Sequence, residues 1–266
     1  LNYLCNELGL DTISVGGTLA VAVEMGERGD ERGVRPGDVA ALTRGVREIA
    51  EPESEFSSAA SRGSLALAEW FGEPDIAMQV KGLELPAYDP RGMQGQGLGY
   101  ATSNRGGCHL RGNMLGFEVL GTPKLVDRSV HGGKAGLLIV AQHLGAALDS
   151  LALCKFSSFA LSEEHYARLY SAVTGIDMGG QELLLAGERI WNLERLYNLR
   201  EGFTAADDCL PDRLLSEPDS GGRVVDLAPM LLEYYRFRGW DDAGVPTTAK
   251  LQQLGVAPCG APGGST

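Results

Sequence analysis

The feature that most constrains this fold is the helical spacing of its apolar residues. No stretch alternates polar and apolar side chains convincingly over six residues, as a half-buried strand would. The clearest helix is 181–199, where Leu184, Gly187, Trp191 and Arg195 share one stripe. The same spacing predicts helices at 1–8, 18–25, 39–49, 57–71, 97–104, 136–148, 162–173, 227–237 and 247–254. We therefore predict an all-α, multihelical fold of two packed helical domains with minor short extended segments.

The segment 76–88 interrupts the helical pattern. Pro74 and Pro86 punctuate it, and a proline disfavours helix in the residue before it. We place a domain boundary here, so that one domain covers residues 1–78 and the other covers 79–266. The glycine- and proline-rich tail from about residue 257 is expected to fray.

Charge and apolar content exclude two classes of partner. The 266 residues carry a net charge of -12, which repels phosphate backbones, so we expect no nucleic acid. No apolar run reaches the roughly 18 residues of a membrane span, so we expect no membrane. The cysteines at 5, 108, 154, 209 and 259 form no CxxC pair and predict reduced thiols in a cytoplasmic protein. The chain opens without Met in the middle of a helical pattern, so we expect an N-terminal truncation.

Two polar segments lie at predicted helix ends and share one pattern. Loop one, residues 6–11, reads Asn-Glu-Leu-Gly-Leu-Asp, and Gly9 is expected to end the preceding helix. Loop two, residues 149–154, reads Asp-Ser-Leu-Ala-Leu-Cys. Each loop alone is compatible with an ordinary helix end, followed by a new helix start or beside a core cysteine. Two copies of one loop predict instead that both contact one ligand with approximate two-fold character.

A third polar segment runs from residue 83 to 109. It gathers Arg91, Asn104, Arg105 and His109 among glycines and turns, which suits recognition of a phosphate or a polar ring. The imidazole of His109 is a candidate acid or base near neutral pH. The alternative is a surface loop with a capped histidine.

These segments together resemble the aldehyde ferredoxin oxidoreductase family. The resemblance rests on the paired D-x-x-G-L-(D/C) loops and on the phrases at 83–92, 99–109, 187–195 and 234–240, and it covers residues 1 to about 256. It implies oxidation of aldehydes to carboxylic acids, with ferredoxin as electron acceptor. It also implies a tungsten bis-molybdopterin (tungstopterin) beside a [4Fe–4S] cluster, with the cofactor supplying the redox chemistry. In family terms, residues 1–78 are the rest of the second domain and 79–266 the third, and an N-terminal domain is missing.

The resemblance also implies roles for individual residues. Asp149 matches an acceptor for the N–H donors of one pterin, and Asn6 takes the equivalent place at the other, where the family has Asp. Ala152 replaces the glycine of loop two, which costs roughly 1 kcal/mol if that position needs positive φ. The positions that match pterin contacts are Asn6, Gly9, Leu10, Asp11, Arg111, Asp149 and Leu153.

Two further positions match the reacting centre and the cluster. His109 matches the histidine beside tungsten, where it would bind the substrate oxygen or move its proton, and its acidic partner would lie upstream. Cys154 matches one ligand of the [4Fe–4S] cluster, whose other three ligands form a C-x-x-C-x-x-x-C run that this chain lacks. The family's interface metal motif would also lie upstream, so a homodimer is only an expectation.

Three other interpretations remain open at this point. The protein is a relative with another substrate, such as an aryl-acid reductase. Alternatively, the chain is an inactive isolated helical fragment. In the third interpretation, it is a helical scaffold without any cofactor. Convergence of loop one, residues 104–109 and loop two on one cavity would favour the redox function.

Overall fold

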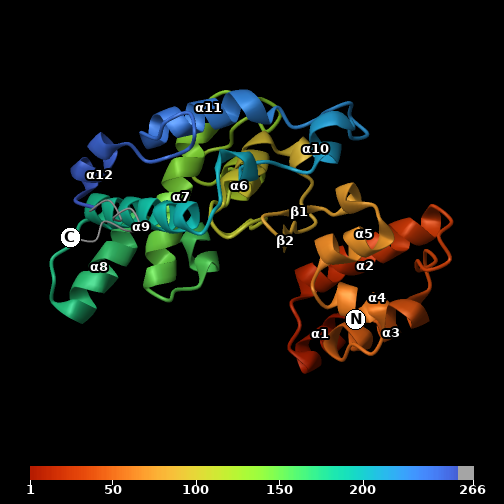
Figure 1. Cartoon of the computed structure of the whole chain (residues 1–266). Coiled ribbons are helices and arrows are strands. Elements are labelled where there is room, and N and C mark those ends of the chain that lie inside the picture. The colour runs from red at the N-terminus through yellow and green to blue at the C-terminus, as the bar shows by residue number, and fades with distance from the viewer. Residues whose placement is uncertain (257–266) are drawn as a thin grey trace, which may run out of the picture. The chain divides into compact units, whose positions relative to one another are not determined.

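The computed structural model describes residues 1–256, so the predicted frayed tail and Cys259 lie outside the described residues. Helices dominate, and the one sheet among residues 1–256 has two strands, which confirms the all-α fold class (Figure 1). The chain forms two compact units. Unit 1 contains Leu1–Arg91, Arg105–Cys108 and Cys209–Val225, and unit 2 contains Gly92–Asn104, His109–Asp208 and the residues from Asp226 onward. The domain boundary near residue 79 stays a prediction.

Unit 1 is built on short helices around an apolar core. Its elements are α1 (Asn2–Leu8), α2 (Thr12–Glu27), α3 (Val39–Ala50), α4 (Glu55–Ala60), α5 (Ser64–Phe71), η1 (Pro74–Ile76), the antiparallel pair β1 (Gln79–Val80) and β2 (Leu83–Glu84), and α10 (Asp212–Ser216). A further 3₁₀ turn, η2 (Pro90–Gly92), crosses the border of the unit. The fully buried Ala22, Val46 and Leu67 come from α2, α3 and α5, so these helices share one core.

Helix α2 begins earlier than the sequence pattern predicted. The Asp11 carboxylate accepts hydrogen bonds from Ile13 N (2.9 Å) and Ser14 N (2.8 Å), so the helix starts at Thr12 rather than near Gly16. Glycine inside a helix costs about 1 kcal/mol relative to alanine, and an Asp N-cap contributes a similar amount. The predicted start was wrong because the adjacent glycines were taken as a boundary.

The single helix predicted at 57–71 was also wrong. The chain breaks between α4 and α5, where Gly63 adopts φ 99°. The carboxylate of Glu84 accepts a hydrogen bond from Ser64 N (2.7 Å) and would lie 2.6 Å from a Cβ at Gly63. A cap supplied from a strand 20 residues away leaves no local signal in the sequence.

Unit 2 holds the longer helices. Its elements are α6 (Gln94–Thr102), the π-helical turn η3 (Gly116–Leu120), α7 (Lys134–Ser150), η4 (Lys155–Phe159), α8 (Glu163–Thr174), α9 (Gly180–Arg200), η5 (Ala205–Asp207), α11 (Leu227–Arg238) and α12 (Thr248–Leu254). Helices α7 and α9 pack closely at Gly187, which has no Cβ. A Cβ there would lie only 1.9 Å from the His143 carbonyl oxygen. The predicted helices of this unit match these elements, with ends that differ by up to three residues.

The glycine-rich helix α6 is buried along its whole length. A Cβ at Gly95 would lie 2.8 Å from Met114, so the glycine allows a close approach of the backbone here. The buried carboxylate of Glu118 accepts from Gly95 N (2.9 Å) and Gln96 N (3.0 Å), where the helix dipole favours a negative charge. Lys134 Nζ, 2.7 Å from Glu118, neutralises that carboxylate in the core.

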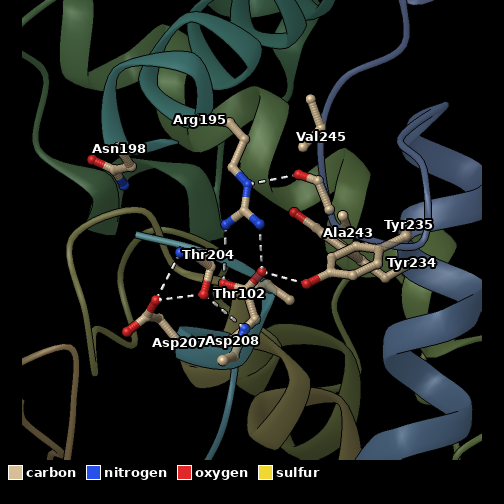
Figure 2. A network of polar contacts seen from close by, with 12 residues as sticks. Thr102, Arg195, Asn198, Thr204, Asp207, Asp208, Tyr234, Tyr235, Ala243 and Val245 are labelled. Carbon is tan, nitrogen blue, oxygen red and sulfur yellow. Dashed lines mark hydrogen bonds and ion pairs between the residues drawn. The ribbon is translucent and has the colours of Figure 1, made fainter. Parts of the chain in front are cut away.

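A second buried ion pair joins α9 to two loops of unit 2 (Figure 2). Arg195 Nη2 lies 3.0 Å from Asp208 Oδ2, and the side chains are 6% and 1% exposed. Arg195 Nε also donates to Gly244 O (2.9 Å), and Tyr235 OH donates to Asp208 Oδ2 (2.5 Å). Burial, followed by the charge and hydrogen bond of Asp208, raises the pKa of the Tyr235 phenol, so Tyr235 stays a donor.

Within residues 1–256 no single helix has the length and apolar content of a membrane span, although α1 and α2, bent by 119° at their junction, pass that test as a pair.

Candidate functional site

Loops one and two have the same backbone conformation, each within its own unit. Gly9 (φ 69°) and Ala152 (φ 55°) are both left-handed and end α1 and α7. The next residue closes the helix in both cases: Leu10 N donates to Cys5 O (2.9 Å), and Leu153 N donates to Leu148 O (3.0 Å). The sequence correspondence between the two loops is therefore also a structural one.

The two loops also continue in the same way. Asp11 (φ -69°, ψ 123°) and Cys154 (φ -65°, ψ 124°) are extended, and they are the N-cap residues of α2 and η4. Each loop therefore links one helix end to one helix start through a left-handed residue. Loop one belongs to unit 1 and loop two to unit 2, so their convergence on one ligand stays a prediction.

Ala152 adopts a positive φ, which is the condition under which the sequence analysis expected a cost. An L-residue with a Cβ pays roughly 1 kcal/mol for this conformation, whereas Gly9 does not. Loop two keeps the loop-one geometry despite this cost, because the two hydrogen bonds from Ala152 N and Leu153 N still form.

In loop one, the side chains divide into structural and exposed ones. Leu10 packs against the unit 1 core, and Asp11 caps α2. Asn6 is exposed, and no heavy atom of its surroundings lies within 4 Å of a Cβ built at Gly9. The exposed members of loop one are Asn6, Glu7, Gly9 and Asp11.

A groove of about 580 Å³ begins beside loop one. Its lining comes from α2, from Met78 just before β1, from the segment after β2 and from α10. It consists of Thr12, Ile13, Gly16, Gly17, Ala20, Met78, Leu85, Pro86, Ala87, Tyr88, Asp89, Pro90, Arg91, Arg213 and Leu214. Arg91, a predicted recognition residue, forms a two-pronged pair with Asp89 (3.0 and 2.7 Å). Burial opposes ionisation of Asp89, but the Arg91 hydrogen bonds outweigh it and lower the pKa of Asp89.

In loop two, Asp149 is surrounded by cations. Arg111 Nη1 donates to Asp149 Oδ2 (2.7 Å), and Lys155 Nζ lies 2.8 Å from the same oxygen. Lys155 also donates to Gly145 O (2.9 Å), which fixes the cation against α7. Since both cations use Oδ2, the arrangement leaves Oδ1 as the oxygen to offer to a hydrogen-bond donor of a ligand.

Glu194 of α9 extends this cluster. Its Oε2 accepts a short hydrogen bond from Asn104 Nδ2, and its Oε1 lies 3.7 Å from Arg111 Nη1. Sequence reasoning brought neither Lys155 nor Glu194 into the site. The position of Lys155 directly after Cys154 was a usable signal, whereas Glu194 comes from a helix 40 residues further along.

The third polar segment is divided between the units. Arg91 and Arg105 belong to unit 1, whereas Asn104 and His109 belong to unit 2. His109 is half-buried in the bend after α6. It is therefore partly accessible, as a proton-transferring imidazole must be.

The Cys154 thiol is free and exposed, as a metal ligand must be before it binds. Leu153 (38% exposed) and the stacked rings of Phe156 and Phe159 (centroids 6.1 Å apart) lie beside it in sequence. Within residues 1–256 no group of three or more His, Cys, Asp or Glu side chains could hold a metal ion. Among residues 1–256, Cys154 could therefore supply only one ligand to an iron–sulfur cluster.

Several known proteins are similar to this chain. A relative from Pyrococcus furiosus, a "Tungsten-containing aldehyde ferredoxin oxidoreductase", is 46% identical over 96% of this chain and 44% of its own length. The protein of the same description from Thermococcus kodakarensis is 43% identical with the same coverage. A more distant relative, "Aliphatic sulfonate oxidoreductase, WOR-like subunit" from Pyrococcus furiosus, is 27% identical over 96% of this chain and 42% of its length.

The fold is also found in a solved structure, "Active site complex BamBC of Benzoyl Coenzyme A reductase in complex with 1,5 Dienoyl-CoA". It matches with a TM-score of 0.70 at 19% identity, over 93% of this chain and 44% of that one. The chain thus spans less than half the length of these relatives. The family model described as "Aldehyde ferredoxin oxidoreductase, domains 2 & 3" matches residues 1–256. The chain belongs to the aldehyde ferredoxin oxidoreductase family.

Proposed function

We propose that the protein containing this chain oxidises aldehydes to carboxylic acids and passes the electrons to ferredoxin. The observation that carries the proposal is the shared backbone conformation of loops one and two, in a family whose curated relatives are described as tungsten-containing. The proposed cofactors are a tungsten bis-molybdopterin and a [4Fe–4S] cluster, which together would supply the two-electron redox chemistry.

The residues of both loops fit a pterin. Asp149 would accept ring N–H donors through Oδ1, while Arg111 and Lys155 hold Oδ2 and neutralise the carboxylate. Asn6 would do the same with one amide oxygen and is the weaker acceptor. Gly9, Leu10, Asp11 and Leu153 would shape the two loops around the rings, and Cys154 would ligate the cluster.

His109 would bind the substrate oxygen or move its proton. Oxidation of an aldehyde with water to a carboxylic acid releases two protons along with the two electrons. A neutral imidazole is suited to accept such a proton near neutral pH. The aldehyde substrate, the ferredoxin partner, a cytoplasmic location and a homodimer all belong to this proposal. So does an N-terminal domain that supplies the remaining cluster ligands.

The test of this function is aldehyde-dependent viologen reduction by the full-length protein, prepared anaerobically. His109→Ala should reduce turnover by about 100-fold or more while tungsten content stays unchanged. The exposed His131 provides the control, since His131→Ala should leave turnover intact. Unchanged turnover in His109→Ala, with tungsten retained, would remove His109 from the mechanism.

A further inference from the structure

The carboxyl of Glu194 lies between an amide and a shared cation in unit 2. Asn104 Nδ2 donates to Oε2, and Arg111 Nη1 lies 3.7 Å from Oε1. The same Arg111 nitrogen donates to Asp149 Oδ2 at 2.7 Å. Arg111 is thus shared unequally by two carboxyl groups, and it is closer to Asp149.

Asn104 carries a buried oxygen that points to a second state of Glu194. Its Oδ1 has no hydrogen-bond partner among the described residues, while its main-chain oxygen accepts from Asn198 Nδ2 (2.7 Å) and holds the residue in place. The oxygen and nitrogen of an amide exchange places when the group rotates by half a turn. In that orientation Oδ1 faces Glu194, and a protonated Glu194 would donate to it, so the contact between the two side chains persists in both protonation states.

The surroundings of Glu194 raise its pKa overall, although neighbouring charges act in both directions. Burial raises the pKa of Glu194, Arg111 opposes this, Asp149 adds to it and Lys155 opposes it. Several charged groups on the elements packed against α9 have partners of their own. These pairs are Lys250 with Glu188, Glu164 with Arg168, His143 with Arg238, Lys134 with Glu118, and Asp208 with Arg195 of α9 itself.

We propose that Glu194 is a proton-binding positioning residue. When it takes up one proton, it no longer attracts Arg111, which then pairs with Asp149 alone. When Glu194 is ionised, it competes for Arg111, and Asp149 keeps more negative charge for a ligand. When Glu194 is protonated, Asp149 holds Arg111 alone and is a weaker acceptor. The second half of this inference rests on the proposed pterin role of Asp149.

The proton site itself is tested by infrared difference spectroscopy of the full-length protein between about pH 5 and pH 9. We expect a protonated-carboxyl band that fades as the pH rises and is lost in Glu194→Gln. Glu194→Asp should keep the band with a shifted midpoint. Glu188→Gln is the matched control, because this carboxyl lies on the same helix and pairs with Lys250 (2.8 Å). No titrating band in the wild type, or the same band in Glu194→Gln, overturns the proton site.

The coupling to Asp149 is tested by the tungsten retained after dialysis at each pH. Retention should rise about two- to fivefold as Glu194 loses its proton, since a more negative acceptor binds N–H donors more strongly. Glu194→Gln should keep the low-pH value throughout, while Glu188→Gln follows the wild type. An unchanged pH dependence in Glu194→Gln overturns the coupling. A protein without tungsten at any pH overturns the proposed function and the coupling with it, whereas the infrared result still decides the proton site.

Discussion

At the scale of single residues, Ala152 shows what loop two requires. Its positive φ is one that glycine adopts without cost, and Gly9 fills the same place in loop one. The loop geometry therefore imposes a conformational cost on Ala152. Replacing Ala152 with glycine removes that cost, and the effect can be measured.

Ala152→Gly should stabilise the end of α7 by up to about 1 kcal/mol, because the left-handed strain disappears. The readout is hydrogen exchange of the Leu153 amide, which closes the helix by bonding to Leu148 O and should exchange up to about fivefold more slowly. Ala160→Gly is the control, since Ala160 has φ -120° and gains nothing from glycine. Faster exchange in Ala152→Gly would show that the strain is not there.

Some residues of the site were predictable and others were not. The left-handed residue of loop one follows from Gly9 in a repeated six-residue pattern, whereas the cap that Asp11 gives α2 was missed because the helix start was placed at the glycines. Glu194 and Asn104 are 90 residues apart and meet only after α9 has packed in unit 2. No local pattern encodes such a contact, so sequence reasoning missed it.

At the scale of elements, helix α9 depends on the buried pair of Arg195 and Asp208. Asp208→Asn leaves the Arg195 guanidinium without its counter-charge in a buried place, which costs about 3–5 kcal/mol. We expect the thermal unfolding midpoint to fall by roughly 10 °C. Asp242→Asn, at an exposed position, is the control and should change the midpoint little. A matching small change in Asp208→Asn would contradict the structural role of the pair.

The contact of α7 with α11 should make stability depend on pH. Burial, then the charges of Arg238 and Lys250, lowers the pKa of His143 from 6.5 to about 3. The unfolded chain therefore binds a proton between these values that the folded chain does not. Stability should be full above about pH 6.5 and fall toward pH 3, by a few kcal/mol in order of magnitude.

His143→Gln removes this proton uptake and keeps a side-chain acceptor for Arg238 Nη1, which lies 2.6 Å from His143 Nε2. The variant should therefore lose less stability than the wild type when the unfolding midpoint is compared at pH 7 and at about pH 4.5. His165→Gln, on α8, should keep the wild-type dependence. Equal losses in His143→Gln and wild type would show that another group is responsible.

Element boundaries were predictable where the signal was local. The helices with Asp38 and Ser162 at their N-caps begin where the sequence pattern placed them. The break between α4 and α5 was missed because its cap comes from Glu84 of β2. Local capping chemistry can be recognised in a sequence, whereas a cap contributed by another element requires the fold.

At the scale of the whole molecule, membership of one family and two loops of one conformation support the proposed function. The fold class and the family follow from periodicity and long motifs, and both were predictable. Whether loops one and two face one ligand was not predictable, because it depends on how the two units pack.

The most direct test of the central claim is the metal content of the full-length protein, expressed anaerobically with tungstate and analysed by mass spectrometry. We expect about one tungsten and about four irons per chain, with tungsten lost when Asp149→Ala removes the proposed pterin acceptor. Full-length protein that folds but contains neither metal would contradict the account. Such a result would mean that the changes at Asn6 and Ala152 belong to a relative whose loops no longer bind a pterin.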